Sequence, residues 1–286
     1  MSDAASGQWA APHRPLTPAE FEQIRRLAYE KFGLDLRHGK EELVSARLGK
    51  QIRESRFRTF DEYCRHVLAD RTGAALAAMI DALTTNFTSF FREPVHFEFL
   101  RRSVLPSLDG RVRAWSAACA TGEEPYSIAI TALEELGHAA QDRLRILATD
   151  ISTRALETAR AAVYLAERCE GTAPPMARYL VRGSGGRVRM RAEVRGLVEF
   201  RRLNLIEPFQ HLGAFHLIFC RNVMIYFDRP TRENLVRRLS DCLEPGGWLF
   251  TGHAESLTGI GHALEYVRPA VYRKPGSAPA RGGRSK

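Results

Sequence analysis

Along the first part of the chain, apolar residues recur every three or four positions, which is the spacing of one face of a helix. A first helix is predicted between Thr17, whose capping box is completed by Glu20, and Gly33, which is expected to end it. Three more helices are predicted over about 40–54, from Thr59 onward and through "TGAALAAMIDALTTN". The pattern therefore predicts a small N-terminal bundle of four helices.

From Arg111 the pattern changes to short apolar runs that alternate with helical segments. Strands are predicted in "RVRAWSAA", "RILATDIS", "LVEFRRLNL", "FHLIFCRNV", "WLFTGHA" and near "AVYRK", with a turn at Pro245-Gly246-Gly247. Helices are predicted in "YSIAITALEELG", in "TRALETARAAV" and over about 230–242. This alternation is typical of an α/β domain built on a parallel sheet.

The stretch "RYLVRGSGGRVRMRAEV" interrupts this alternation, because two alternating runs flank the glycines of 183–186 and predict an inserted β-hairpin. The net charge of +9 is concentrated here and at the end of the chain. Residues 176–205 hold eight arginines and two glutamates, and 268–286 hold six basic residues and no acid. Such patches indicate an acidic partner, whether nucleic acid, anionic lipid or protein, or a solvated, disordered tail over 276–286.

Composition narrows the class of protein. Hydrophobic residues make up 44% and charged residues 26%, as in ordinary globular proteins. The sequence shows neither a secretory leader nor an apolar run of ~18 residues, so a cytoplasmic protein is expected. The five cysteines lie far apart without zinc-type spacing, so they are expected to be reduced thiols and no structural metal is predicted.

The turn in "SAACATGEEPYSIAI" follows a predicted strand and opens a helix, but it differs from a dinucleotide-binding turn. It holds one glycine, Gly122, and the adjacent Glu123 and Glu124 would repel a diphosphate. S-adenosylmethionine carries a sulfonium and an ammonium, which these acids favour; helix capping by the acids is the alternative. Asp150, at the end of the next strand, is expected to accept ribose hydroxyls or, alternatively, to cap the following helix.

Six motifs resemble, in their order and spacing, those of the chemotaxis receptor methyltransferases, the CheR family. They are "TTNFTSFFRE" (84–93), "WSAACATGEEPYSIAI" (115–130), "ATDIS" (148–152), "NL" (204–205), "IFCRNVMIYFD" (218–228) and "GHAESL" (252–257). The resemblance covers about 17–274. It implies an α/β protein with a small N-terminal helical bundle and a Rossmann-like S-adenosylmethionine-dependent methyltransferase domain carrying an inserted β-hairpin subdomain. The implied divisions are a receptor-recognition domain over 17–90 and a methyltransferase domain over 91–275. An insertion over about 176–200 lies within the second domain, and a disordered basic tail covers 276–286.

The resemblance also implies a reaction. A methyl group would pass from S-adenosyl-L-methionine to glutamate side chains in the cytoplasmic domain of methyl-accepting chemotaxis receptors, leaving S-adenosyl-L-homocysteine and serving sensory adaptation. No metal, nucleic acid or membrane insertion is expected, and the protein is expected to be a monomer. A glutamate carboxylate, with a reference pKa of ~4.3, is already nucleophilic at neutral pH, so catalysis is expected to rest on positioning and exclusion of water.

Site residues follow from the motifs. Arg92 and Tyr226 are expected at the reacting centre, with Arg92 orienting the cofactor or the substrate carboxylate. A structural ion pair of Arg92 with Glu93 or Asp150 is the alternative. His253 is either a hydrogen-bonded structural histidine or a functional one. The cofactor contacts that the resemblance implies are Asn86, Thr88, Arg92, Glu124, Asp150, Asn204, Leu205, Asn222 and Val223.

Substrate recognition is assigned to the helix over 40–54. Its basic residues Arg47, Lys50 and Arg53 are expected to bind an acidic receptor surface, and a solvated helix face is the alternative. The hairpin turn is shorter than in family members that grip a receptor tail, so methylation is expected not to depend on the receptor's C-terminal peptide.

Two rival functions involve nucleic acid. A nucleic-acid methyltransferase would carry an NPPY-like or DPPY-like loop where this chain has "CRNVMIYF". A basic, non-catalytic module would lose nucleic-acid affinity steeply with salt.

Overall fold

The computed structural model describes residues 15–55, 57–84, 87–169 and 176–276. The chain divides into two compact units, residues 1–85 and 86–286. The sequence placed the boundary later, at 90/91. The difference arises because Phe90 and Phe91 are buried in the core of the second unit. Within the described ranges, no helix is both long and apolar enough to cross a membrane.

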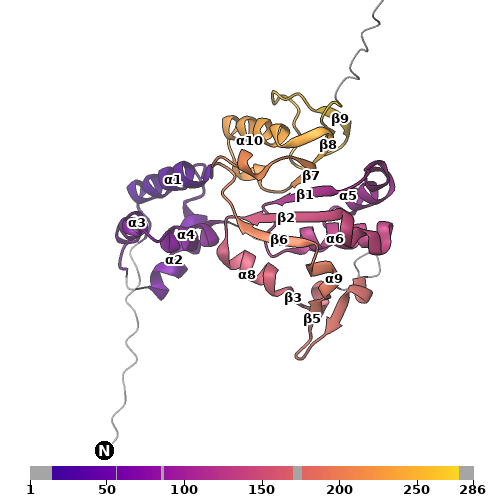
Figure 1. The fold of residues 1–286 in the computed structure, drawn as a ribbon. Helices are drawn as coiled ribbons and strands as arrows, with labels where there is room; N and C mark the ends of the chain where they lie inside the picture. The colour runs from indigo at the N-terminus through magenta and orange to yellow at the C-terminus, as the bar shows by residue number, and fades with distance from the viewer. Residues whose placement is uncertain (1–14, 56, 85–86, 170–175, 277–286) are drawn as a thin grey trace, which may run out of the picture. The chain divides into compact units, whose positions relative to one another are not determined.

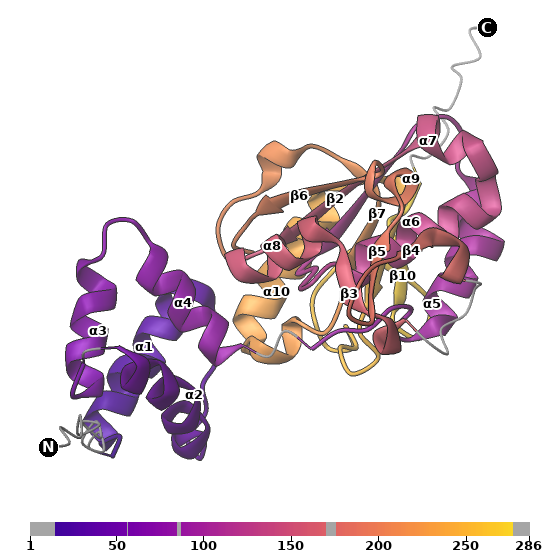
Figure 2. The same ribbon diagram turned by 90° about the horizontal axis from the view of Figure 1, so that it is seen from below.

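The first unit contains the four predicted helices, which Figure 2 shows as one compact group. The Thr17 hydroxyl accepts from the Glu20 amide at 3.3 Å, the Glu20 carboxylate accepts from the Thr17 amide at 3.0 Å, and Gly33 ends the first helix with φ +69°. The apolar faces meet in a core that includes Phe21, Ile24, Val44, Leu48, Tyr63 and Ile80. The helices are α1 (Pro18–Phe32), α2 (Glu41–Glu54), α3 (Phe60–Ala69) and α4 (Ala74–Leu83).

The second unit is built on a seven-stranded sheet in the order β6-β2-β1-β7-β8-β10-β9. Figure 1 shows β8, β7, β1, β2 and β6 stacked one above another, and these five strands pair in parallel. The remaining strand pairs are antiparallel: β10 pairs with β8 on one side and with β9 on the other. The strands are β1 (Val112–Ala117), β2 (Leu144–Asp150), β6 (Val198–Arg202), β7 (Phe215–Cys220), β8 (Leu243–Thr251), β9 (Glu265–Arg268) and β10 (Val271–Arg273).

Alternating residues of the strands enter two separate cores. Ala114 of β1 packs with helices α5 and α6, whereas its neighbour Trp115 packs with α10. Alternation over two apolar faces is what a parallel sheet covered on both sides requires. The helices of this unit are α5 (Pro94–Phe99), α6 (Glu123–Leu136), α7 (Ala140–Arg143), α8 (Thr153–Ala161), α9 (Ala192–Arg195) and α10 (Arg229–Asp241).

One prediction about this sheet was wrong, and two elements of this unit were not predicted. The turn expected at 245–247 lies inside β8, because Gly246, with φ +78°, lets the strand continue through an irregular register. The short strand β9 and the helical segment from Pro94 to Ser107, which includes a π-helical turn at Leu100–Val104, were not predicted.

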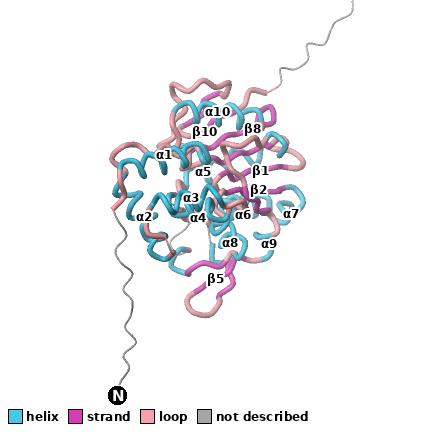
Figure 3. The backbone as a smooth tube through the Cα atoms, turned by 90° about the vertical axis from the view of Figure 1, so that its left-hand side faces the viewer, coloured by secondary structure: helices cyan, strands magenta, loops and turns pink. Residues whose placement is uncertain are grey.

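The predicted hairpin is present as β4 (Leu180–Arg182) and β5 (Arg187–Met190), but it belongs to a three-stranded sheet. Its third strand, β3 (Val163–Leu165), had been assigned to the end of a helix. Ala162 adopts a left-handed φ of +53°, which ends α8 and lets Val163 and Tyr164 extend. In Figures 1 and 3 the small sheet, marked by β5, stands apart from the main strands. The insertion thus starts earlier than 176 and ends before β6.

The turn between β1 and α6 holds an unusual backbone. Ala118, Ala120 and Gly122 have φ values of +63°, +47° and +96°. Each alanine there costs about 1–2 kcal/mol relative to a right-handed conformation. The amide of Cys119 donates to the carbonyl of Thr149 at 2.9 Å, so the turn is fixed against the neighbouring strand.

Gly122→Ala is expected to lower the free energy of unfolding by about 2–4 kcal/mol, since backbone strain and overpacking add. A Cβ at Gly122 would lie 2.8 Å from the Cβ of Ala159. Gly259→Ala is the matched control, because Gly259 has φ +77° but no atom within 4 Å of such a Cβ. Urea unfolding followed by the fluorescence of Trp115 and Trp248 measures both variants; equal losses would contradict the packing argument.

Candidate active site

Strand register brings the predicted cofactor residues to one edge of the main sheet. Ala117, the last residue of β1, pairs with Thr149 on one side and with Cys220 on the other. The chain order of the strands reverses between β1 and β7, which is where ligands of open α/β sheets bind. The segments that leave this edge carry Glu124, Asp150, Asn204, Leu205, Asn222 and Val223.

Asp150 fixes the turn after β1. Its side chain is nearly buried, Oδ2 accepts from the Ala120 amide at 2.8 Å, and Oδ1 accepts from the Ser152 amide at 2.9 Å. The helix cap of α8 is Ser152, whose hydroxyl accepts from the Ala155 amide. The alternative in which Asp150 caps α8 is therefore wrong, and Asp150 holds the strained turn at the mouth of the site.

Glu124 is compensated within the protein. Its side chain is 12% exposed, it accepts from the Ser116 hydroxyl at 2.7 Å, and it lies 3.1 Å from the Arg221 guanidinium. Burial raises the pKa of Glu124, while Arg221 and Ser116 oppose that rise. Any cationic group of a cofactor would therefore meet a carboxylate that already shares its charge with Arg221.

Arg221 is a site residue that the sequence reasoning missed. Its side chain is 1% exposed, and it lies 3.0 Å from Glu93 as well as 3.1 Å from Glu124. The guanidinium also donates to the carbonyl oxygen of Arg92. One buried arginine thus joins the end of β7, the start of α6 and the segment before α5. The signal in the sequence was a charged residue directly after the buried strand "LIFC".

Glu255 of "GHAESL" was missed as well. It is 3% exposed and accepts from the amides of Asn222 and Gly252 at 2.7 Å and of Ile225 at 3.2 Å. Burial raises the pKa of Glu255, and these backbone donors oppose the rise. Asn222 has a left-handed φ of +58°, so the carboxylate compensates for local strain. Glu255 therefore shapes the loop in which Asn222 and Val223 lie.

Arg92 and Tyr226 flank this region. Arg92 donates to the carbonyl of Phe87 at 3.1 Å. The ion pairs of the described residues include none between Arg92 and Glu93 or Asp150, so that alternative is wrong for this structure. Tyr226 is half-buried at the end of a 3₁₀ turn, Met224–Tyr226.

Of the four other residues expected to contact the cofactor, the structure describes three. Asn204 is half-buried and its Oδ1 accepts from the Ile206 amide, which turns the chain after β6. Leu205 is buried against α10. Thr88 is half-buried, and Asn86 lies outside the described residues. In the same segment, Phe90 and Phe91 are core residues, whereas Phe87 is 71% exposed.

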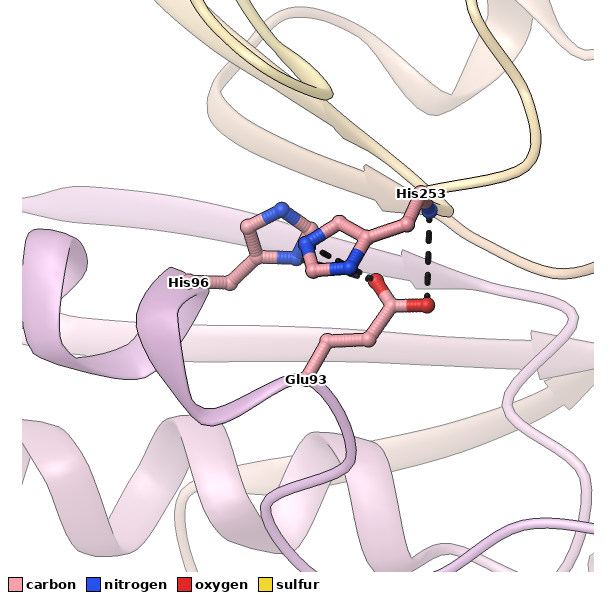
Figure 4. A group of neighbouring side chains, drawn as sticks. All are labelled: Glu93, His96 and His253. Atoms are coloured by element: carbon pink, nitrogen blue, oxygen red, sulfur yellow. Dashed lines mark hydrogen bonds and ion pairs between the residues drawn. The ribbon is translucent and has the colours of Figure 1, made fainter.

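Glu93, His96 and His253 form a compact cluster, in which the three side chains point toward one another (Figure 4). Glu93 Oε2 lies 3.5 Å from Nδ1 of His96 and 3.9 Å from Nε2 of His253, whose amide donates to Oε1. Ligand atoms within 4.8 Å of one another meet the spacing of a metal site. However, the Arg221 guanidinium already pairs with Oε2, and its charge opposes a divalent cation. We assign Glu93 to its ion pair with Arg221 and to the hydrogen bond from the His253 amide.

Lowering the pH is expected to destabilise the protein through His96. Burial, and secondarily Arg221, lower the pKa of this 1% exposed histidine to about 3. The unfolded imidazole binds its proton near pH 6.5, so the unfolded chain carries more protons between about pH 6.5 and 3, and stability rises with pH across that window. At pH 5.5 the loss from this group should be about 1.4 kcal/mol relative to pH 7.5.

Urea unfolding at pH 7.5 and 5.5 checks this expectation. His96→Phe should remove about that much of the pH dependence, because it keeps a ring beside Phe250 without a titrating nitrogen. His211→Gln changes an exposed histidine of the same unit and should leave the dependence as it is. Identical pH profiles for the wild type and His96→Phe would contradict the assignment.

Comparison with known proteins covers both units. A family model described as "CheR methyltransferase, all-alpha domain" matches residues 19–84, and one described as "CheR methyltransferase, SAM binding domain" matches residues 86–272. "Chemotaxis protein methyltransferase 2" of Pseudomonas aeruginosa is 42% identical over 263 residues, covering 90% of this chain and 93% of the relative. "Chemotaxis protein methyltransferase" of Escherichia coli is 40% identical over 267 residues, covering 90% and 91%.

A solved structure of an S-adenosylmethionine-dependent methyltransferase from Mesorhizobium loti matches 52% of this chain and 50% of that chain. The sequence identity is 17% and the TM-score is 0.30, which is too low to establish a shared fold. The family assignment therefore rests on the two family models and on the relatives at about 40% identity. The chain belongs to the CheR methyltransferase family, with an all-α domain followed by an S-adenosylmethionine-binding methyltransferase domain.

Proposed function

We propose that this chain transfers a methyl group from S-adenosylmethionine to glutamate side chains of chemotaxis receptors, forming methyl esters that serve sensory adaptation. The observation that carries the proposal is the acidic edge of the main sheet. There, the carboxylates of Glu93 and Glu124 pair with one arginine, Arg221, and Asp150 ends the neighbouring strand β2. These carboxylates suit a cofactor with cationic groups and disfavour one with phosphates.

Each residue of the edge has a role in this proposal. Asp150 receives the ribose hydroxyls, while Asn204 and Leu205 lie by the adenine. When bound, S-adenosylmethionine supplies an electrophilic methyl on a sulfonium. The residues Thr88, Asn86, Glu124, Asn222 and Val223 hold the cofactor from the remaining sides. Arg92 orients the cofactor or the incoming carboxylate, and Tyr226 lines the path to the methyl.

The chemistry asks little of these side chains beyond position. A receptor glutamate is ionised at neutral pH, so its oxygen would accept the methyl group directly, the carbon–sulfur bond breaking as the new carbon–oxygen bond forms. No proton moves in this step, so Tyr226 and Arg92 need not act as acid or base. Bringing the two reactants in line and excluding water supply the acceleration.

Transfer of labelled methyl to receptor-containing membranes, followed by mild alkali, tests the proposal. Glutamyl esters release volatile methanol, whereas methylated amines and nucleic-acid bases keep their label. Label that resists alkali would assign a different acceptor chemistry. Label in added nucleic acid instead of receptor would support the rival methyltransferase.

We also propose that α2 binds the receptor through its exposed basic residues. Lys50 and Arg53 are exposed. The Lys50 ammonium lies 3.9 Å from the Glu54 carboxylate, which is a weak ion pair at the surface. Arg47 differs, because it is half-buried and donates to the carbonyl of Leu83 at the end of α4. We therefore assign Arg47 mainly to packing within the bundle and the other two to an acidic receptor helix.

Lys50→Gln combined with Arg53→Gln is expected to lower kcat/KM for receptor methylation several-fold at low salt, and less at high salt, because surface charges act through screened attraction. Affinity for S-adenosylhomocysteine should stay unchanged. Arg58→Gln combined with Arg71→Gln removes the same charge from exposed positions outside α2 and serves as the control. Equal losses in both double variants would assign the effect to net charge alone.

We further propose how the protein acts in the cell. The protein would act as a cytoplasmic monomer without metal, nucleic acid or membrane insertion. Its short hairpin turn, 183–186, would leave methylation independent of the receptor's C-terminal peptide.

A further inference from the structure

The small sheet contacts the turn that opens the cofactor site. Tyr164, in the middle of β3, donates its hydroxyl proton to the carbonyl oxygen of Thr121 at 2.8 Å. The tyrosine is 3% exposed, and its ring packs edge-on against Phe90 at 5.0 Å and Tyr126 at 6.5 Å. The strained turn between Ala118 and Gly122 is therefore braced from the inserted sheet as well as from β2.

Arg168, in the short helical turn after β3, reaches two further segments. Its Nη2 lies 2.8 Å from Oε1 of Glu123, the first residue of α6, and 3.1 Å from the carbonyl oxygen of Thr88. Glu123 is fully buried, whereas 40% of the Arg168 side chain is exposed. The other oxygen of Glu123 accepts from the Thr121 hydroxyl at 2.6 Å.

Because Glu123 is buried, its charge depends on the ion pair with Arg168. Burial raises the pKa of Glu123, while Thr121 and Arg168 act in the opposite direction. Without Arg168, a carboxylate at the start of α6 would be left without its counter-charge or would take up a proton. Either change alters the hydrogen bonding of Thr121 and hence the turn that it belongs to.

We propose that Arg168 is a positioning residue of the methyltransferase, which fixes the 118–122 turn and the 87–92 segment relative to each other through Glu123 and Thr88. The inference rests on the proposed function only in that these two segments hold the cofactor. Arg168 itself directly follows β3 of the inserted sheet and acts through its two partners. The insertion thereby becomes a structural part of the cofactor site.

The structure offers a matched control for an ordinary ion pair. Arg178 is also an arginine of the inserted segment and also pairs with a glutamate of α6, Glu134, at 3.1 Å. That contact lies near the far end of α6, away from the turn. If the ion pairs only stabilised the insertion against α6 in general, replacing either arginine would weaken cofactor binding equally.

Calorimetric titration of the full chain with S-adenosylhomocysteine tests the proposal. Arg168→Gln should weaken binding about tenfold, equivalent to about 1.4 kcal/mol, and Arg168→Lys should recover part of that loss. Arg178→Gln should bind as the wild type does. Adding Glu123→Gln to Arg168→Gln should weaken binding less than the two single changes combined, because the residues form one unit.

Wild-type affinity in Arg168→Gln, or an equal loss in Arg178→Gln, would overturn the proposal. If Arg168→Gln does not fold, Arg168→Lys decides: unchanged affinity overturns the proposal, and a loss that Arg178→Lys lacks supports it. The readout is binding of the product cofactor, so a failure to methylate receptors would overturn the proposed function without affecting this test.

Discussion

The Arg221 guanidinium is held, almost without exposure, between the carboxylates of Glu93 and Glu124. Desolvating three charges is expensive, and such a group persists only when each charge is paired and hydrogen-bonded. Here the arginine also donates to the backbone of Arg92 and lies 5.6 Å above the ring of Phe97. Removing one partner of such a cluster typically costs about 3–5 kcal/mol, because the others remain buried and uncompensated. Three segments far apart in sequence are thereby tied together at the candidate-site edge of the main sheet.

The same edge contains several strained backbones, and acids compensate for them. Asp150 accepts amides on both oxygens beside Ala120, and Glu255 does the same beside Asn222. Left-handed residues that are not glycine persist only where their surroundings hold them. The carboxylates that make the edge acidic therefore also determine its shape. A substitution at Asp150 would change both properties at once, so a loss of cofactor affinity there would not by itself prove a ribose contact.

Local signals predicted most of the fold. The Thr17 capping box, the glycine hairpin turn and the alternation of strands with helices each depend on neighbours in sequence, and each element was found. Strand β3 escaped prediction because three residues that pair with β5 form a strand only through that distant partner. Family motifs placed Glu124 and Asp150 at the site edge. The motifs include Arg221 and Glu255 but assigned them no role, and Arg168 lies outside the motifs, because the roles of all three depend on contacts across the fold.

The basic character of the inserted segment now has two physical sources. Arginines such as Arg182, Arg187 and Arg189 are exposed, as expected of charges that face solvent or an acidic partner. Arg168 instead turns inward to a fully buried carboxylate. Salt weakens the interactions of the fully solvated arginines more than the pair of Arg168 with Glu123, because the Glu123 carboxylate is buried. High ionic strength should therefore separate the proposed partner binding by the outer face of the insertion from the proposed role of Arg168 beside the 118–122 turn, although both depend on the same residue type.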